Sequence, residues 1–313
     1  MFDPVILFFL LGVFAGISRS DLKIPAVLYE SLSIFLLLAI GLKGGVALSQ
    51  YDPVSLLGPI VVVLAASCLV PIGAFFIAHR MGGYSRFDSG ALAAHYGSVS
   101  VVTFAVATSL LMKQSIEAEG YMTVFLVLLE IPGLLIGVFL AKKGANNGPW
   151  AHLLKEIFTG KSIVLLVGGL LIGYVAGEAG TASIAPLFFG LFKGVLAIFL
   201  LEMGLVTASR IAEIKRQGVF LLCFGTFFPL LAGLLGITTA WSLGMSVGGM
   251  TLLGTLFASA SYIAAPAAVR MAVPEANPST SIAASLGVTF PFNITVGIPL
   301  YLYISQLLKG VPL

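Results

Sequence analysis

The sequence predicts an all-α membrane protein with ten transmembrane helices. Of its 313 residues, 59% are hydrophobic and only 9% are charged, and the mean hydropathy is +1.09. Soluble globular chains carry far more charge than this. The apolar residues form blocks of about 17 to 25 residues, the length that a helix needs to cross about 30 Å of hydrocarbon. Short segments of alternating hydrophobicity, typical of a transmembrane β-barrel, do not recur, so we expect the blocks to satisfy their backbone groups as helices.

Ten apolar blocks follow one another along the chain. The first has no basic residue before it and no small-residue cleavage site, so we expect a membrane span and not a removable signal peptide. The fourth and ninth are interrupted by serine pairs, which we interpret below. The approximate bounds of the ten blocks are 4–18, 25–48, 54–77, 89–112, 121–141, 163–176, 185–209, 219–241, 247–271 and 282–307.

The basic residues sort strongly to one side of the predicted bundle. Lys113 and Lys309 follow even-numbered blocks, whereas Lys43 and Lys193 lie toward the outer ends of their blocks, where snorkelling explains both. Because cytoplasmic loops retain positive charge, we place the odd-numbered connections inside and both termini outside a bacterial inner membrane. The twelve residues in those odd-numbered connections are Arg19, Lys23, Arg80, Arg86, Lys142, Lys143, Lys155, Lys161, Arg210, Lys215, Arg216 and Arg270.

The chain divides into two predicted halves, residues 1–141 and 163–313, joined by a cytoplasmic linker at residues 142–162. Five spans in each half would give the halves opposite orientations, so they would form an inverted repeat. Landmarks recur at offsets of 160 to 163 residues, a spacing read directly from the chain. The matched pairs are Leu38 to Leu42 with Leu201 to Leu205, Ser98 and Ser100 with Ser259 and Ser261, and Gly137 with Gly297.

Within the linker, the segment WAHLLKEIF at residues 150–158 has apolar residues at helical spacing. Trp150, Leu153, Leu154 and Ile157 follow the i, i+3, i+4, i+7 pattern. We expect a short helix that lies at the membrane interface on this apolar face.

Two serine-containing stretches interrupt the fourth and ninth blocks, HYGSVSVVT at 95–103 and FASASYIAAP at 257–266. Small hydroxylated residues at matching places in two halves are typical of broken transmembrane helices that form a transporter's binding site. The freed N-termini of the second half-helices, with serine hydroxyls, would make a small anion site without arginine or lysine. The alternative is that these serines bond to carbonyls of their own helices or join helix pairs.

Several residues are candidates for binding a coupling cation. Glu130 and Glu202 lie within apolar blocks, where a carboxylate normally meets a cation or carries a proton. Thr103 and Asn293 supply neutral oxygens of the kind that Na⁺ needs, although single Thr and Asn residues more often join helices. His95 is more often a neutral hydrogen-bonding residue than a proton carrier.

Other classes of function lack their signatures in this sequence. We find no HExxH, CxxC, GxSxG or Walker-type motif, so we expect neither an enzyme nor a transition-metal site. The net charge is +3 with no cluster of basic and aromatic residues, so no nucleic-acid partner is expected. Cys68 and Cys223 lie in different apolar blocks and are expected to be packing residues.

Across essentially its whole length the chain resembles the sodium-dependent bicarbonate transporters known from cyanobacteria. The motifs that carry the resemblance are GLKGG at 41–45, YGSVS at 96–100, MGLVTASRI at 203–211, SASYIAAPAAVR at 259–270 and VPEANPS at 273–279. It implies core and gate domains, a homotrimer and a cytoplasmic PII-like regulator as a possible partner. The bicarbonate positions that it implies are Gly97, Ser98, Ser100, Ala258, Ser259 and Ser261.

Tyr262 is a departure from that family's pattern. Cyanobacterial members have an acidic residue directly after the second serine pair, and this chain has a phenol there. Tyr262 is therefore expected to contact both the anion and Na⁺, as a weaker cation ligand than a carboxylate.

The sequence thus predicts a secondary active transporter that imports a small anion, most simply bicarbonate, by symport with Na⁺. An anion that enters a negative-inside cell opposes about 2.3 kcal/mol per 100 mV, and a cotransported cation removes that barrier. Na⁺ would be bound by Thr103, Glu130, Asn293 and Tyr262, with no organic cofactor. The alternatives are a Na⁺- or H⁺-coupled transporter of a small organic anion, similar to bile-acid symporters, an anion channel and a non-transporting scaffold.

The predicted orientation can be tested by cysteine labelling in a background in which Cys68 and Cys223 are alanine. Glu178→Cys should react with a membrane-impermeant maleimide on intact cells, and Asn147→Cys should react only after the cells are opened. The opposite pattern would reverse the assignment of the two faces.

Overall fold

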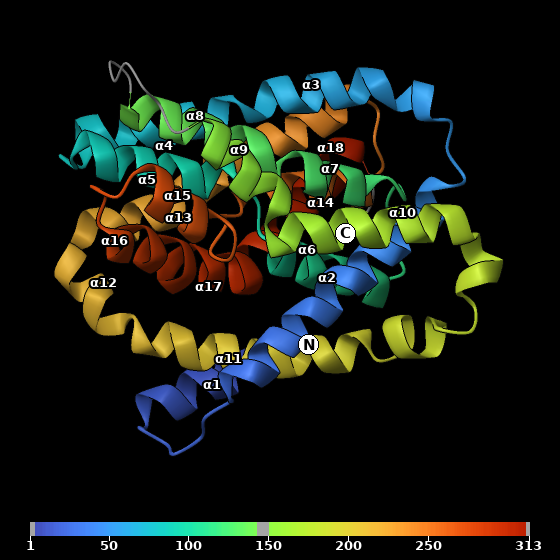
Figure 1. The fold of residues 1–313 in the computed structure, drawn as a ribbon, viewed down its shortest axis with the longest axis horizontal. Helices are drawn as coiled ribbons and strands as arrows, with labels where there is room; N and C mark the ends of the chain where they lie inside the picture. Colours follow the sequence, from blue (N-terminus) through green and yellow to red (C-terminus); the bar gives the residue numbers. More distant parts are fainter. Residues whose placement is uncertain (1–3, 143–149, 311–313) are drawn as a thin grey trace.

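The computed structural model describes residues 4–142 and 150–310, and these are folded entirely as helices and connections, without a strand (Figure 1). Eight helical segments in them are long and apolar enough to cross a membrane. Two further apolar helices, Pro4–Ile17 and Val247–Ala258, are shorter than a full span. The prediction of an α-helical membrane protein is therefore confirmed, whereas the count of ten spans remains a prediction.

In the first half, several of the predicted blocks are divided into more than one helix. The third block comprises a 3₁₀ turn, two α-helices and a π-helical turn, and the fourth and fifth blocks are each divided in two. The bounds are α1 Pro4–Ile17, α2 Ala26–Leu48, η1 Pro53–Leu56, α3 Leu57–Ser67, α4 Leu69–Phe76, η2 Ile77–Met81, α5 Arg86–Gly97, α6 Val101–Lys113, α7 Met122–Leu128 and α8 Glu130–Lys142.

The second half begins after the linker helix and ends in a segment with repeated π-helical turns. Its helices are α9 Trp150–Thr159, α10 Lys161–Thr181, η3 Pro186–Gly190, α11 Phe192–Ser209, α12 Ile211–Gln217, α13 Val219–Ser242, α14 Val247–Ala258, α15 Ala265–Ala272, α16 Pro278–Ile282, η4 Ala283–Thr289, α17 Phe290–Phe292, η5 Asn293–Gly297 and α18 Ile298–Lys309. Part of the predicted linker, residues 143–149, lies outside the described residues.

Two closely packed helix pairs form one side of the molecule, α1 with α11 and α2 with α10. Figure 1 shows α1 (blue) and α11 (yellow) side by side along its lower edge. Glycines allow this approach: a Cβ on Gly12 or Gly204 would overlap backbone atoms of the facing helix, and Gly41 meets the Leu166 carbonyl in the same way. Small residues four apart, as at Gly41 and Gly45, are the usual means by which membrane helices pack backbone to backbone.

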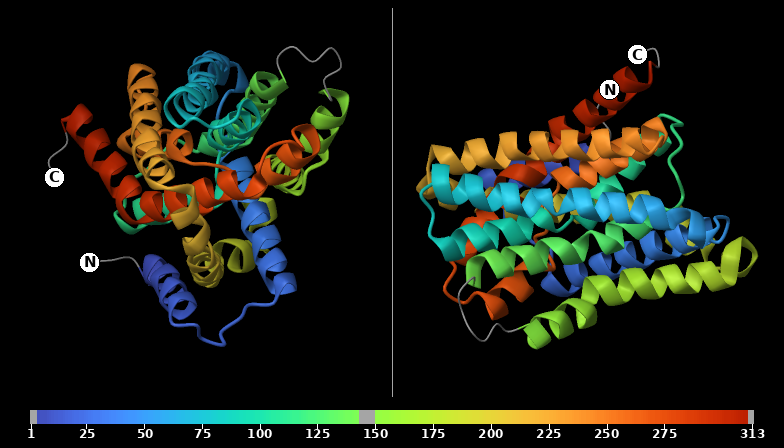
Figure 2. Two further views of the ribbon diagram at one scale, coloured as in Figure 1. Left: turned by 90° about the vertical axis from the view of Figure 1, so that its left-hand side faces the viewer. Right: turned by 90° about the horizontal axis from the view of Figure 1, so that it is seen from above.

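The remaining long helices form a second group that holds both broken helices. In it α5 packs on α8 and α4, and α14 packs on α13 and α18 (Figure 2). The closest approach is between Gly133 of α8 and Gly97 at the end of α5, where a Cβ on Gly133 would overlap the Gly97 carbonyl. The broken helices therefore lie inside this second group, with α8 directly against the first break.

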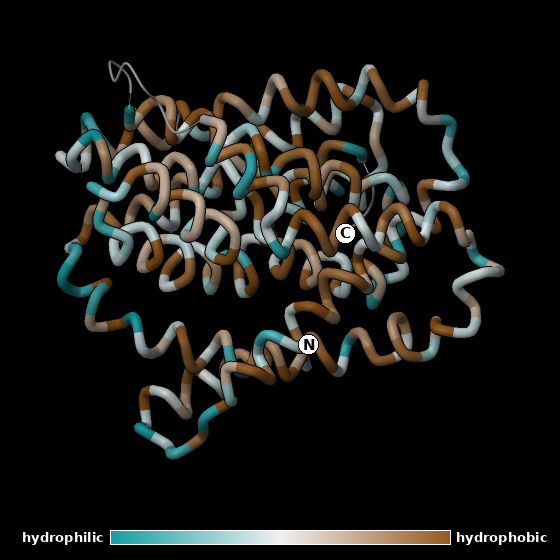
Figure 3. The backbone as a smooth tube through the Cα atoms, in the orientation of Figure 1, coloured by the Kyte–Doolittle hydropathy of each residue, from teal (hydrophilic) through white to brown (hydrophobic). Residues whose placement is uncertain are grey.

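Apolar residues extend along the helices and polar residues collect at the turns between them (Figure 3). Many large apolar side chains face outward, among them Val175, which is 84% exposed, and Phe14, which is 67% exposed. Exposed apolar surface on this scale is far beyond that of a soluble monomer. Lipid contact explains it, because hydrocarbon imposes no penalty on these side chains.

The linker segment forms the predicted helix, α9, and part of its apolar face is buried against the protein. Leu153 and Ile157 are buried in a cluster with Ala268 and Val269 of α15. Leu154 is 39% exposed, and the side chain of Trp150 lies outside the described part. The apolar face therefore packs at least partly on the second half of the broken ninth block, because that surface offers more apolar contact than the headgroup region.

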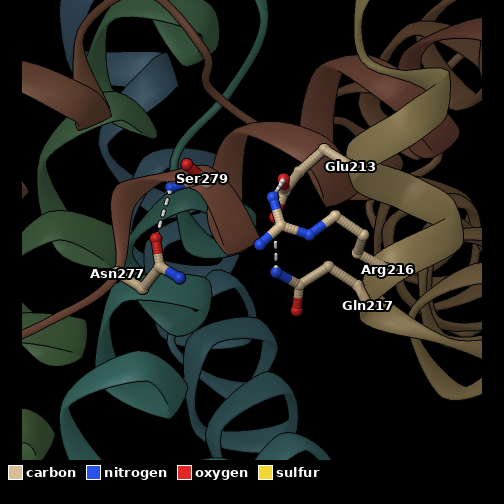
Figure 4. A network of polar contacts seen from close by, with 5 residues as sticks. All are labelled: Glu213, Arg216, Gln217, Asn277 and Ser279. Carbon is tan, nitrogen blue, oxygen red and sulfur yellow. Dashed lines mark hydrogen bonds and ion pairs between the residues drawn. The ribbon is translucent and has the colours of Figure 1, made fainter.

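Polar contacts hold the connections at the end of the molecule where most basic residues gather. The Lys142 ammonium lies 2.6 Å from Glu275, and this hydrogen bond lowers the pKa of the Glu275 carboxyl. The backbone N–H of Asn277 donates to Asp88 at 2.7 Å. Figure 4 shows that Asn277 caps α16 through Ser279, beside α12, where Glu213 contacts Arg216 and Gln217. The connection after α15 is thereby tied to α5 and α8.

The burial of α9 gives a matched pair of variants. Leu153→Ala should lower the free energy of unfolding by about 2 to 4 kcal/mol, since it leaves a cavity in a closed apolar cluster. Leu154→Ala, one residue along and exposed, should change it by less than about 1 kcal/mol. Denaturant or thermal unfolding of the detergent-solubilised protein measures both, and equal effects would contradict the packing of α9 on α15.

Candidate functional site

Two helix breaks with the same backbone form lie at the predicted serine pairs. α5 ends at Gly97 and α6 begins at Val101, while α14 ends at Ala258 and α15 begins only at Ala265. Ser98 has φ −94° and ψ 169°, and Ser259 has φ −82° and ψ 165°, so both leave their helices in an extended conformation. The prediction that both blocks are broken at these serines is confirmed.

The two breaks are hydrogen-bonded to each other. The Ser261 N–H donates to the His95 carbonyl at 2.8 Å, and the His95 ring nitrogen Nδ1 lies 2.7 Å from the Ser261 carbonyl. The Ser100 N–H donates to the hydroxyl of Ser259 at 2.9 Å. Extended segments in a low-dielectric interior must find partners for their backbone groups, and here each break supplies partners for the other. His95 thus joins the breaks, as the hydrogen-bonding alternative for this residue predicts.

Three of the four serine hydroxyls are engaged within the protein. Ser100 caps α6, since its Oγ accepts from the N–H and the hydroxyl of Thr103 at 3.2 and 2.9 Å. Ser261 accepts from the Ala265 N–H at 3.2 Å, at the start of α15. Ser259 donates to the Leu256 carbonyl at 2.8 Å while it accepts from the Ser100 N–H. These three hydroxyls hold the broken helices in shape.

Ser98 differs from its counterpart Ser259. Its side chain is only 1% exposed, and its hydroxyl has no hydrogen-bond partner among the described residues. A buried hydroxyl without a partner costs about 1 to 3 kcal/mol, so such groups usually mark a place for a ligand or water. Of the four serine hydroxyls, that of Ser98 at the first break is therefore the one without a partner among the described residues.

A small cavity lies at the first break, with a volume of about 10 Å³. Gly97 and Ser98 of the break line it, together with Leu129, the residue before α8, and Ser67 of α3. This volume is about what one water molecule needs. The lining would therefore have to move apart for a larger anion to bind beside the Ser98 hydroxyl.

Glu130 stands close to this first break. It is the first residue of α8 and lies three residues before Gly133, on the same face of the helix that packs on Gly97. Its side chain is 1% exposed, and its Oε2 has no partner in the described structure. A buried carboxylate without a compensating charge is suited to binding a cation or a proton.

The other predicted cation ligands divide between the two breaks. Thr103 lies one turn inside α6 with its hydroxyl on Ser100, at the first break. Asn293 belongs to the second break: its Nδ2 donates to the Ala258 carbonyl at 2.8 Å, and its Oδ1 accepts from the Tyr301 hydroxyl at 3.0 Å. Both ends of the Asn293 amide are therefore used to hold the end of α14.

Tyr262 bridges the breaks. Its hydroxyl is buried and faces the Ser100 side chain without completing a hydrogen bond, and its ring meets Phe290 edge to face at 5.3 Å. Glu202 belongs to α11, with a buried Oε2 that has no partner among the described residues. The structure thus brings Ser98 and Glu130 to the first break and places Thr103 and Tyr262 against Ser100.

Sequence reasoning misses several residues that shape the site. Gly133 permits the contact of α8 with the first break, and the Tyr301 hydroxyl donates a hydrogen bond to the Asn293 side-chain amide oxygen. The Tyr96 hydroxyl lies 2.7 Å from Thr289, whose own hydroxyl donates to the Gly225 carbonyl. A glycine one turn from an intramembrane carboxylate is a signal that points to Gly133, whereas nothing in the sequence distinguishes Tyr301 from other tyrosines.

The sequence also matches the model of a known protein family. Residues 4–306 match the family model of the Na⁺-dependent bicarbonate transporter superfamily. A search of curated proteins finds no significant match.

Proposed function

Because the chain belongs to the Na⁺-dependent bicarbonate transporter superfamily, we propose that it imports bicarbonate by symport with Na⁺. The observation that carries this proposal is the unpartnered hydroxyl of Ser98, buried at the junction of two broken helices and lining a small cavity. A donor in that position is ready for an acceptor that arrives from outside the protein.

The anion would bind at the positive end of α6. Val101 and Val102 begin this helix, so their backbone N–H groups have no partner within the helix. Together with the Ser98 hydroxyl they would provide several donors to a single oxyanion, and the helix dipole favours negative charge there. Gly97, Ser100 and, across the crossing, Ala258, Ser259 and Ser261 would shape the rest of the site, with their hydroxyls positioning backbone more than contacting the anion.

Na⁺ would bind next to the anion on the side of Glu130. The buried carboxylate would supply the charge, and the oxygens of Thr103 and Tyr262, which face Ser100, would supply neutral ligands. Asn293 would act indirectly, since its amide holds the Ala258 carbonyl at the end of α14. Two opposite charges that bind side by side stabilise each other strongly in a low-dielectric site, which is the physical basis of coupled transport.

An inverted repeat would allow this site to open alternately to the two sides. The packing supports such a repeat. If each helix is replaced by its counterpart in the other half, the pair α1 and α11 becomes the pair α10 and α2. In the same way, the pair α5 and α8 becomes the pair α14 and α18. The glycine contacts correspond in the same way, since Gly12 lies against the backbone of Leu201 and Gly169 lies against the backbone of Leu38. We assign α1, α2, α10 and α11 to the gate and the remaining long helices to the core, with ten spans in all.

The alternatives receive less support. The family match favours bicarbonate over a bile-acid-like organic anion. An anion channel needs a continuous polar path, and the serines at the breaks are at most 4% exposed. Family resemblance supports a homotrimer and a PII-like regulator as a possible cytoplasmic partner. The sorting of the basic residues supports a bacterial inner-membrane protein with both termini outside.

Uptake of radiolabelled bicarbonate into proteoliposomes tests the function and the Ser98 assignment together. Wild-type uptake should require an inward Na⁺ gradient. Ser98→Ala should raise the bicarbonate concentration for half-maximal uptake about 5- to 150-fold, because one donor to a desolvated anion is worth about 1 to 3 kcal/mol. Ser109→Ala removes an equally buried and unpartnered hydroxyl further along α6 and should leave uptake unchanged. Equal behaviour of the two variants would move the anion site elsewhere.

The coupling ion is tested through Glu130. Glu130→Gln preserves the shape and removes the charge, so the Na⁺ concentration for half-maximal uptake should rise by about tenfold or more. The half-saturating bicarbonate concentration at saturating Na⁺ should change much less. Uptake that ignores Na⁺ and follows an imposed pH gradient would instead make Glu130 a proton carrier and overturn Na⁺ symport.

A further inference from the structure

A second cavity lies between the two helix groups and reaches the ends of the breaks at Val101, Val102 and Ile263. It has a volume of about 10 Å³ and is lined by α2, α6, α11 and the segment after the second serine pair. Each of these four elements contributes at least one lining residue, for example Ile40, Ala105, Phe199 and Ile263 in that order. Ile263 directly follows Tyr262, so this seam leads from the helix ends toward the crossing of the breaks.

The three helices that line this seam each carry a lysine at the same end. Lys43 lies three residues after Ile40 on α2, Lys113 is the last residue of α6, and Lys193 lies in the first turn of α11. The Lys43 ammonium contacts the sulfur of Met112, next to Lys113, at 3.4 Å. The charge of Lys193 lies within electrostatic range of Lys43, and α2 and α11 are in direct contact.

This arrangement is unfavourable unless an anion is nearby. Like charges repel, and Lys43 and Lys193 both stand within apolar helices, where a charge is costly. In the described part of the chain no carboxylate comes within 4.0 Å of either ammonium. Carboxylates of neighbouring connections have other partners: Asp52 accepts from Val54 and Ser55, and Glu119 accepts from Ser246.

Snorkelling to lipid headgroups does not account for the direction of Lys43. Its ammonium meets a residue of α6, across the seam, and a thioether is only a weak hydrogen-bond acceptor. Most of its donor capacity therefore remains available at the seam. Because an ammonium is a compact, strongly hydrated charge, it can hold a passing anion without binding it tightly.

We propose that Lys43 and Lys193 form an outer recruitment site for the small oxyanion at the mouth of the seam. This inference rests on the proposed function and adds an earlier binding step to it. The lysines raise the local concentration of the anion and so increase its rate of arrival at the central site. They make no contact with the anion at the breaks, so the maximal rate of transport does not depend on them.

The test is bicarbonate uptake into proteoliposomes at saturating Na⁺, measured at low and at high ionic strength. Lys43→Gln and Lys193→Gln should each raise the KM for bicarbonate about two- to fivefold at low ionic strength, with an unchanged maximal rate. At high ionic strength, screening should bring the KM values of the variants and the wild type together. Lys43→Arg keeps the charge and should behave as wild type.

Lys309→Gln is the matched control. Lys309 is placed by its sequence at the same end of the molecule, but its ammonium contacts the Gly244 carbonyl at 3.4 Å, away from the seam. This variant should match wild type at both ionic strengths, and size-exclusion profiles in detergent show whether each variant is folded.

The outcomes separate the two proposals. If the wild-type protein took up no bicarbonate, the proposed function would fail, and the recruitment site with it. If the wild type transported normally and the Lys43 and Lys193 variants kept its KM, or showed the same KM increase at every ionic strength, only the recruitment site would be overturned.

Discussion

Backbone hydrogen bonding inside the membrane is the constraint on which this structure depends. A broken helix exposes N–H and C=O groups where no water is available, and each unsatisfied group costs several kcal/mol. The protein meets this cost by placing two breaks against each other, so that His95 and Ser261 exchange hydrogen bonds and Ser259 accepts from the Ser100 N–H. Neither break is stable alone, which explains why two helices distant in sequence must be broken at matching points.

Close packing provides the second requirement, because the breaks must be held in register. Gly133 allows α8 to lie against the carbonyl of Gly97, and Asn293 reaches the Ala258 carbonyl from the other side. A side chain at position 133 would separate α8 from α5 and carry Glu130 away from the first break. The lack of a side chain at Gly133 is therefore as important for the geometry of the site as the polar side chains that line it.

The two breaks share a backbone form and differ in the chemistry of their first serine. Ser259 is fully engaged in holding the crossing, whereas Ser98 has no partner in the described structure. The difference places the free donor, the small cavity and Glu130 on one side of the crossing. Tyr262, where cyanobacterial relatives have an acidic residue, lies in the second break, and Glu130 is a buried carboxylate beside the first break.

Local sequence by itself determined the class of the protein and the places where its helices break. Composition alone requires membrane helices, and the small-Ser-x-Ser stretches carry both hydroxyl caps and little side-chain bulk, so the breaks at residues 98 and 259 were predictable. The family resemblance was also readable from motifs such as SASYIAAPAAVR at 259–270. Only the tertiary structure decided which serine is free, that Asn293 is committed to the Ala258 carbonyl, and that Leu153 of α9 packs on α15. These outcomes depend on which partner lies nearest in space, and a hydroxyl, an amide or an apolar helix face has the same local pattern whichever partner it meets.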